Sequence, residues 1–242
     1  MIALLRIIAV AIFAVVMFVF GCGYCLLSPR NPKHVFTFGR MFAAMSKVFG
    51  IKLELRIPED AYKRGQAIYI ANHQNNWDLF TVSSAVTPKV VTVGKKSLAW
   101  MPLFGQLYWL TGNILIDRAN KTKAKGTINQ VVDSIKSSDV SVWMFPEGTR
   151  SRGRGLLPFK TGAFHAAMGA EVPVIPIVCS STRHLKLNRW DNGHVIVEML
   201  PPVSYEEYKD KSVRDLSNQC YEAMKVKLEE LDKEVAHLNA KK

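Results

Sequence analysis

Short apolar runs beyond Gly50 constrain the fold of this chain more than any other feature. The run 51–57 alternates as a half-buried strand does, and the run 194–200 precedes two prolines. Five further runs are almost continuously apolar, as buried parallel strands are: 67–71, 90–94, 113–116, 140–145 and 174–179. Helical stretches are expected between the strands and after them: near 77–86, 121–137 and 159–169, and from about 212 to 238. This alternation predicts an α/β fold with a mainly parallel sheet flanked by helices.

The N-terminus carries an uncharged apolar segment of about 21 residues, 7–27, which is long enough to cross or enter a bilayer. A secretory signal peptide is the alternative, with Arg6 before the apolar run. Apolarity continues to Leu27, and nothing later in the chain needs an oxidising compartment, so a retained anchor is the preferred interpretation. Cations flank both ends of the segment, which favours a hairpin that enters and leaves the same membrane face.

A second N-terminal segment follows two helix-breaking prolines, Pro29 and Pro32. At helical periodicity one face of this segment is apolar: Val35, Phe38, Phe42, Met45 and Phe49. Arg40 and Lys47 fall on the opposite face. The pattern predicts an amphipathic helix in the plane of the lipid headgroups. The alternative is a helix that packs this stripe on the core of its own domain.

The charge balance indicates anionic partners. The 242 residues include 32 Lys and Arg against 20 Asp and Glu, a net charge of +12, which suits lipid headgroups, phosphates or nucleic acid. Nucleic acid is disfavoured, because the basic residues gather near the N-terminal segment and the site described next. The four cysteines predict no disulfide framework, and the C-x-x-C at Cys22 and Cys25 lies within the apolar segment.

The stretch "YIANHQNNWDLF" places His73 and Asp78 five positions apart. His73 directly follows the expected strand 67–71, and Asn75 or Asn76 would cap a helix that holds Asp78 in its first turn. A strand–turn–helix bend can bring the two side chains into contact at the C-terminal edge of the sheet, where α/β proteins bind ligands. Asp78 could instead merely complement the helix dipole.

Three later stretches accompany this pair: "GNILIDR" with Arg118, "FPEGTRS" with Glu147 and Arg150, and "VPVIPI" at 172–177. In order and spacing, the four blocks resemble those of the glycerolipid acyltransferase family, whose first block is His-x4-Asp. The resemblance covers about 72–177. The basic, hydrophobic N-terminus agrees with it, and we expect membrane-anchoring helices over residues 1–50 and a catalytic domain over residues 51–242.

The resemblance also implies a chemistry. A fatty acyl group would move from acyl-CoA or acyl carrier protein to the sn-2 hydroxyl of lysophosphatidic acid, giving phosphatidic acid without a cofactor or metal. His73 would act as general base, oriented by Asp78. The chain has no G-x-S-x-G elbow and no cysteine in a reactive context, so direct transfer is expected. The location implied is the bacterial inner (cytoplasmic) membrane, with the catalytic domain on its cytoplasmic face.

Acceptor binding is assigned by the same resemblance to five residues: Gly112, Arg118, Glu147, Gly148 and Arg150. Glu147 is expected to hold an arginine or a glycerol hydroxyl, although an Arg–Glu pair could also be a structural salt bridge. Weaker candidates for phosphate or acyl-donor contacts are cations near the expected strand ends: Lys95, Lys96, Arg152, Arg154 and Lys160.

Several alternatives stay open. Within the family, the acceptor could be glycerol-3-phosphate or another lysophospholipid. Outside it, His73 and Asp78 could bind a metal together with Asp191 or His194, as in a hydrolase. The chain could also be a catalytically idle, basic module that binds membrane lipids.

Overall fold

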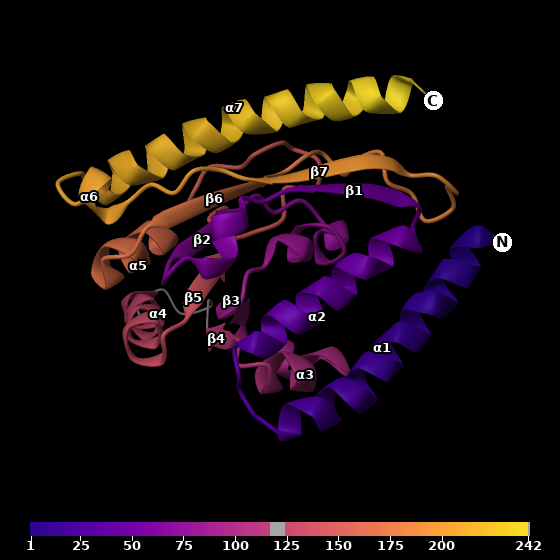
Figure 1. The fold of residues 1–242 in the computed structure, drawn as a ribbon, viewed down its shortest axis with the longest axis horizontal. Coiled ribbons are helices and arrows are strands. Elements are labelled where there is room, and N and C mark those ends of the chain that lie inside the picture. The colour runs from indigo at the N-terminus through magenta and orange to yellow at the C-terminus, as the bar shows by residue number, and fades with distance from the viewer. Residues whose placement is uncertain (117–123, 242) are drawn as a thin grey trace.

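The described part of the chain forms one seven-stranded sheet with helices on both faces (Figure 1). The computed structural model describes residues 1–116 and 124–241. The strand order is β1-β7-β6-β2-β5-β3-β4. The strands are β1 Ile51–Arg56, β2 Ile68–Ala71, β3 Val90–Lys95, β4 Ile114–Ile116, β5 Ser141–Met144, β6 Val174–Cys179 and β7 Gly193–Met199. Each of the seven predicted runs forms one of these strands, so the prediction of the sheet is confirmed.

Strand direction places the carboxyl ends of five neighbouring strands on one edge. β6, β2, β5, β3 and β4 are mutually parallel. β7 runs antiparallel to β6 and pairs in parallel with β1, so these two strands point the other way. The segments that follow β2 and β5 therefore meet at the same edge of the sheet.

The helices form two layers around this sheet. The α-helices are α1 Ile2–Leu26, α2 Lys33–Ala44, α3 Phe104–Leu110, α4 Ala124–Ser138, α5 Gly162–Ala170, α6 Tyr205–Tyr208 and α7 Val213–Ala240. α7 lies along β6 and β7, whereas α2 and α3 lie on the opposite side, with α1 outermost (Figure 1). The helix expected at 77–86 is instead two short 3₁₀ helices, Asn76–Leu79 and Val82–Ala85.

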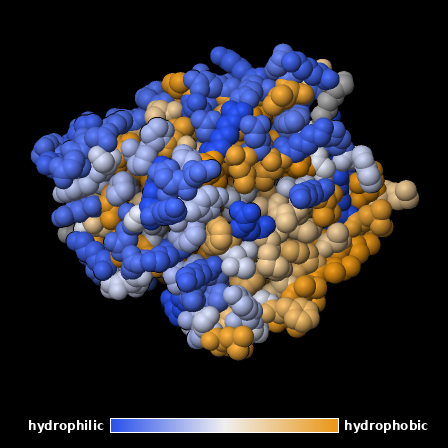
Figure 2. Space-filling view, in the orientation of Figure 1, coloured by the Kyte–Doolittle hydropathy of each residue, from blue (hydrophilic) through white to orange (hydrophobic). Residues whose placement is uncertain are grey.

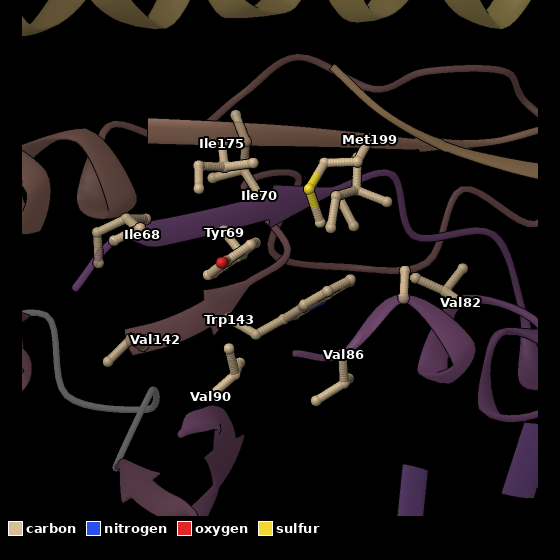
Figure 3. Packing of buried hydrophobic residues seen from close by; sticks show 14 of the residues in the cluster. Ile68, Tyr69, Ile70, Val82, Val86, Val90, Val142, Trp143, Ile175 and Met199 are labelled. Carbon is tan, nitrogen blue, oxygen red and sulfur yellow. The ribbon is translucent and has the colours of Figure 1, made fainter. Parts of the chain in front are cut away.

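The central strands carry the core between these layers. Ile68 and Ile70 of β2 and Ile175 of β6 are fully buried, and Figure 3 shows them packed beside Tyr69 and Trp143. The rings of Tyr69 and Trp143 stack with an interplanar angle of 7°. Buried apolar side chains on both faces of β2 hold its carboxyl end, and hence the turn that follows it, in a fixed position.

The apolar stripe of the second N-terminal segment is buried, so the prediction that it faces lipid is wrong. Val35, Met45 and Phe49 belong to the main core of the domain. Phe49 is 1% exposed, and its ring lies 4.9 Å from that of Trp77 and 4.8 Å from that of Phe80. Helical periodicity identifies an apolar face but not what covers it, and here β3, the 3₁₀ helices after β2, and α1 cover it.

α1 packs one face on the domain and leaves the other face exposed. Met17 and Cys25 form a small apolar cluster with Phe38 of α2 and Leu107 of α3. At Gly21 a Cβ would lie 3.1 Å from the side chain of Leu107, so the glycine permits this close approach. Large apolar residues cover the outward face: Leu4, Leu5, Ile7, Ile8, Ile12, Val15, Val16, Val19 and Phe20.

In the described residues, α1 is the one helix long and apolar enough to cross a membrane. Figure 2 shows hydrophobic surface along the edge of the molecule where Figure 1 places α1.

The position of Phe49 can be tested by truncation. We expect Phe49→Ala to lower the free energy of unfolding by about 3–5 kcal/mol, because it opens a cavity beneath Trp77 and Phe80. The matched control is Val48→Ala, since Val48 is the neighbouring residue and is 42% exposed. Denaturant unfolding measures the stability of each variant, and vesicle co-sedimentation measures its membrane binding. Normal stability with lost vesicle binding would instead place Phe49 in the lipid.

Candidate active site

The turn after β2 brings His73 and Asp78 together, as the sequence predicts. The Nδ1–H of His73 donates to Oδ2 of Asp78 over 2.6 Å. Asn75 caps the 3₁₀ helix by accepting from the N–H of Trp77, which places Asp78 in the first helical turn. Oδ2 of Asp78 also accepts the backbone N–H groups of Gln74 (2.7 Å) and Asn75 (3.2 Å). One buried carboxylate oxygen thus fixes both the turn and the imidazole.

The imidazole is further fixed by an aromatic neighbour. The ring of Phe145, directly after β5, stacks on that of His73 with centroids 4.1 Å apart and an interplanar angle of 18°. The side chain of His73 is 20% exposed, against 5% for Asp78. Because Nδ1 is committed to Asp78, Nε2 is the nitrogen left to accept a proton. This arrangement can perform general-base chemistry.

Glu147 ties the turn that carries His73 to the loop after β5. Its Oε1 accepts the backbone N–H of His73 over 2.6 Å, and its Oε2 accepts the backbone N–H of Leu157 over 2.9 Å. The residue is 3% exposed, and this burial raises the pKa of its carboxyl group. Glu147 therefore holds two backbone amides, a role that the sequence analysis did not expect.

The same two segments are joined by backbone hydrogen bonds. The N–H of Ser151 donates to the carbonyl of His73 (2.8 Å), and that of Arg152 to the carbonyl of Gln74 (2.9 Å). On the side of β6, the amide of Asn72 exchanges two hydrogen bonds with the backbone of Cys179. The turn that carries His73 is thus braced by both neighbouring strands.

Sequence reasoning missed the bracing amides, Asn72 and Gln74. The side chain of Gln74 donates to the carbonyls of Cys179 and Ser180 and accepts from the N–H of Thr182. The clue was the density of amide side chains around His73 in "ANHQNN". A buried amide at a strand end must find backbone partners, so such a cluster predicts a braced turn. With Glu147 and Asp232, these amides line a polar pocket, and His73 is not one of its lining residues.

Cations gather at the loop after β5. Gly148 has φ +69°, and a Cβ there would meet Nζ of Lys160 at 2.8 Å, so this ammonium lies directly over the loop. Arg150 and Arg152 are exposed beside it. A glycine in the left-handed region, followed by backbone amides and flanked by cations, suits an anion.

Not all of the other predicted binding residues lie at the edge of the sheet that carries His73. Lys95 and Lys96 are exposed at the carboxyl end of β3, on the same edge of the sheet. Gly112 has φ +88°, and a Cβ there would lie 2.7 Å from the carbonyl oxygen of Arg30, so this glycine serves a tight turn. Arg118 lies outside the described residues.

No group of three potential metal-ligating side chains occurs in residues 1–116 and 124–241. In that part of the chain, His73 and Asp78 therefore gain no third ligand from Asp191, His194 or any other such residue. Asp191 pairs with Lys52, its Oδ2 lying 3.7 Å from the ammonium.

Comparison with known proteins decides the family. A family model described as "Acyltransferase" matches residues 52–180, the region that holds the site. The chain belongs to this acyltransferase family. It is 59% identical over 241 residues to the 1-acyl-sn-glycerol-3-phosphate acyltransferase of Escherichia coli strain K12, covering 99% of this chain and 98% of that protein.

Other members of this acyltransferase family match over most of their length. The 1-acyl-sn-glycerol-3-phosphate acyltransferase of Haemophilus influenzae is 51% identical, with 99% of this chain and all (100%) of that protein covered. The crystal structure of the 1-acyl-sn-glycerophosphate (LPA) acyltransferase PlsC from Thermotoga maritima superposes with a TM-score of 0.76. That match covers 94% of this chain and 95% of the other at 24% identity, and it shows a shared fold.

The bracing role of Glu147 can be separated from substrate contact. We expect Glu147→Gln to lower kcat while leaving the KM for the acceptor nearly unchanged, because an amide can accept only one of the two N–H groups. Displacing His73 by about 1 Å can cost as much as ~10²-fold. Glu171→Gln, at an exposed helix end, is the control. A raised KM at normal kcat would show instead that Glu147 contacts the acceptor.

Proposed function

We propose that the protein transfers a fatty acyl group from a thioester to the sn-2 hydroxyl of lysophosphatidic acid, giving phosphatidic acid. The observation that carries the proposal is the His73–Asp78 hydrogen bond, braced by the loop that bears Arg150. Base and cations thus stand on one rigid edge of the sheet. The printed names of the bacterial relatives, which match over nearly their full length, support the same acceptor.

His73 acts as the general base of this reaction. Its Nε2 takes the proton of the acceptor hydroxyl as the oxygen attacks the thioester carbonyl carbon. The Asp78 carboxylate holds the tautomer and stabilises the imidazolium that forms. When the tetrahedral intermediate collapses, the C–S bond breaks and the thiolate takes the proton from His73. The acyl group passes directly to the acceptor, so no acyl-enzyme forms.

The phosphate of the acceptor binds at the loop after β5. Arg150 and the ammonium of Lys160, over Gly148, supply the positive charge. Arg118 is assigned to the same phosphate by family resemblance. Because Glu147 and Ser151 connect this loop to the backbone of His73, binding and catalysis share one scaffold.

The acyl donor is acyl-CoA or acyl carrier protein. Both present the acyl group as a thioester on an anionic, water-soluble carrier, for which exposed cations beyond the acceptor loop are suitable contacts. Lys95 and Lys96, at the carboxyl end of β3, are candidates for this contact.

Residues 1–50 hold the catalytic domain, residues 51–242, at the bacterial inner membrane, with the site on the cytoplasmic face. The exposed apolar face of α1 supports this role. Membrane attachment lets the acceptor present its hydroxyl while its acyl chain stays in lipid. Exposure of that chain would otherwise cost ~0.8 kcal/mol per CH₂.

Replacing the base tests the mechanism. We expect His73→Ala to reduce acyl transfer at least ~10²-fold with unchanged folding, because the imidazole that takes the hydroxyl proton is lost. Asp78→Asn should also be severely slowed. His165→Ala, at an exposed position of α5, is the control. Turnover of radiolabelled acyl-CoA with lysophosphatidic acid measures the effect. Activity within a few-fold of the unmodified protein would remove His73 from the mechanism.

The phosphate assignment is tested on the acceptor side. Arg150→Ala should raise the KM for lysophosphatidic acid far more than the KM for the donor, since a hydrogen bond to a charged group contributes ~1.5–3 kcal/mol. Arg214→Ala, on the exposed face of α7, is the control. The assay should include glycerol-3-phosphate and a neutral lysophospholipid as alternative acceptors. An unchanged KM for the acceptor would show that its phosphate does not bind at Arg150.

A further inference from the structure

An exposed tryptophan stands beside the N-terminal end of α1, in the loop that joins β6 to β7. Trp190 is 75% exposed and Leu187, in the same loop, is 41% exposed. Single exposed apolar side chains are common on soluble proteins, so exposure alone indicates nothing. The surroundings of this loop are more informative.

A buried arginine from α1 holds the loop in place. Arg6 is 5% exposed. Its guanidinium donates to the loop carbonyls of Leu187 (2.9 Å), Arg189 and Trp190 (3.0 Å), and also to the carbonyl of Val48 (3.0 Å). The fork of an arginine is suited to several such acceptors at once. The first turns of α1 and the β6–β7 loop are therefore one rigid unit.

Asn192 fixes the loop from its other side. Its side-chain amide donates to the carbonyls of Phe49 (2.8 Å) and Lys186 (2.9 Å), and its Oδ1 accepts the N–H of Lys186 (2.8 Å). Gly50, with φ +67°, leaves room for the carbonyl of Trp190, which a Cβ would meet at 2.1 Å. Several loop carbonyls are thus satisfied internally, while the side chains of Trp190 and Leu187 stay exposed.

The N-terminal end of α1, like the loop beside it, exposes apolar side chains. Leu5 and Ile7 flank Arg6 in the chain and are 58% and 54% exposed. Figure 1 places the β6–β7 connection and the N-terminal end of α1 at the same edge of the molecule. Exposed apolar side chains thus occur both on the N-terminal end of α1 and on the loop beside it.

The charge around the loop is positive. Lys186 and Arg189 are exposed and make no ion pair within residues 1–116 and 124–241. The carboxylate of Asp191 is paired with Lys52. An indole at the edge of an apolar surface, with cations beside it, suits the headgroup level of an anionic bilayer.

We propose that the β6–β7 loop is a second membrane contact, with Trp190 at the headgroup level and Arg6 as the latch that joins it to α1. The proposal extends the anchor beyond residues 1–50 and does not depend on the reaction catalysed. At its other end α1 packs on Phe38 and Leu107. Both ends of the helix are therefore held by the same domain, and α1 lies along the membrane surface.

Depth-dependent quenching tests the contact on the full chain. A fluorophore is attached to Trp190→Cys, and the protein is reconstituted in phosphatidylethanolamine–phosphatidylglycerol vesicles that contain lipids with a nitroxide high on the acyl chain. Val226→Cys, on α7 and 54% exposed, is the matched control. The natural cysteines are buried or half-buried, and the unsubstituted chain serves as blank. We expect quenching at position 190 to exceed that at 226 by roughly twofold or more.

A second site and a second variant keep the test decisive. Leu187→Cys repeats the measurement if Trp190→Cys melts at a lower temperature than the unsubstituted chain. Arg6→Met retains an apolar α1, so the chain should stay on vesicles while quenching at 190 falls. Quenching at 187 and 190 no greater than at 226 would overturn the membrane contact. Undiminished quenching in Arg6→Met would overturn the latch.

Discussion

Two buried carboxylates determine the geometry on which the rest of the site depends. One oxygen of Asp78 accepts hydrogen bonds from the imidazole of His73 and from two backbone N–H groups. Glu147 accepts the N–H of His73 itself and that of Leu157. Removing either acid leaves buried donors unpaired, at ~1–3 kcal/mol each. The histidine is therefore held from both its side chain and its backbone before any substrate arrives, which is how a general base is preorganised.

The N-terminal helices and the turn that carries His73 belong to one packed body. Phe49, at the end of the N-terminal region, lies beneath Trp77 and Phe80 of the turn. Arg6 of α1 reaches the carbonyls of the β6–β7 loop. The exposed apolar face of α1 therefore has a fixed orientation relative to His73. An interfacial enzyme benefits from this rigidity, because its acceptor diffuses in two dimensions and must meet the base at one depth.

The sequence predicted the sheet well and the segment after His73 less well. The β-type runs show a period of two or continuous apolarity, and these local patterns predict strands without knowledge of the tertiary contacts. The segment 77–86 has apolar residues that suit a helix, but it forms two 3₁₀ helices that break at Thr81. The hydroxyls of Thr81 and Ser83 donate to the carbonyls four residues earlier, and such bonds disfavour a continuous α-helix. Local hydrogen bonding overrode helical periodicity there.

The sequence by itself determined which residues can do the chemistry and where they stand along the chain. His73 follows one buried strand and Arg150 another, and parallel strands place both on the same edge. Only the tertiary structure decided that Glu147 braces His73, that Phe49 belongs to the core and that Arg6 reaches the β6–β7 loop. The partners of Phe49 and Arg6 are set by packing: a periodic pattern reveals an apolar face or an unusual charge but not the element that covers it. Glu147 and His73 are 74 positions apart, and no local pattern encodes a hydrogen bond across that separation.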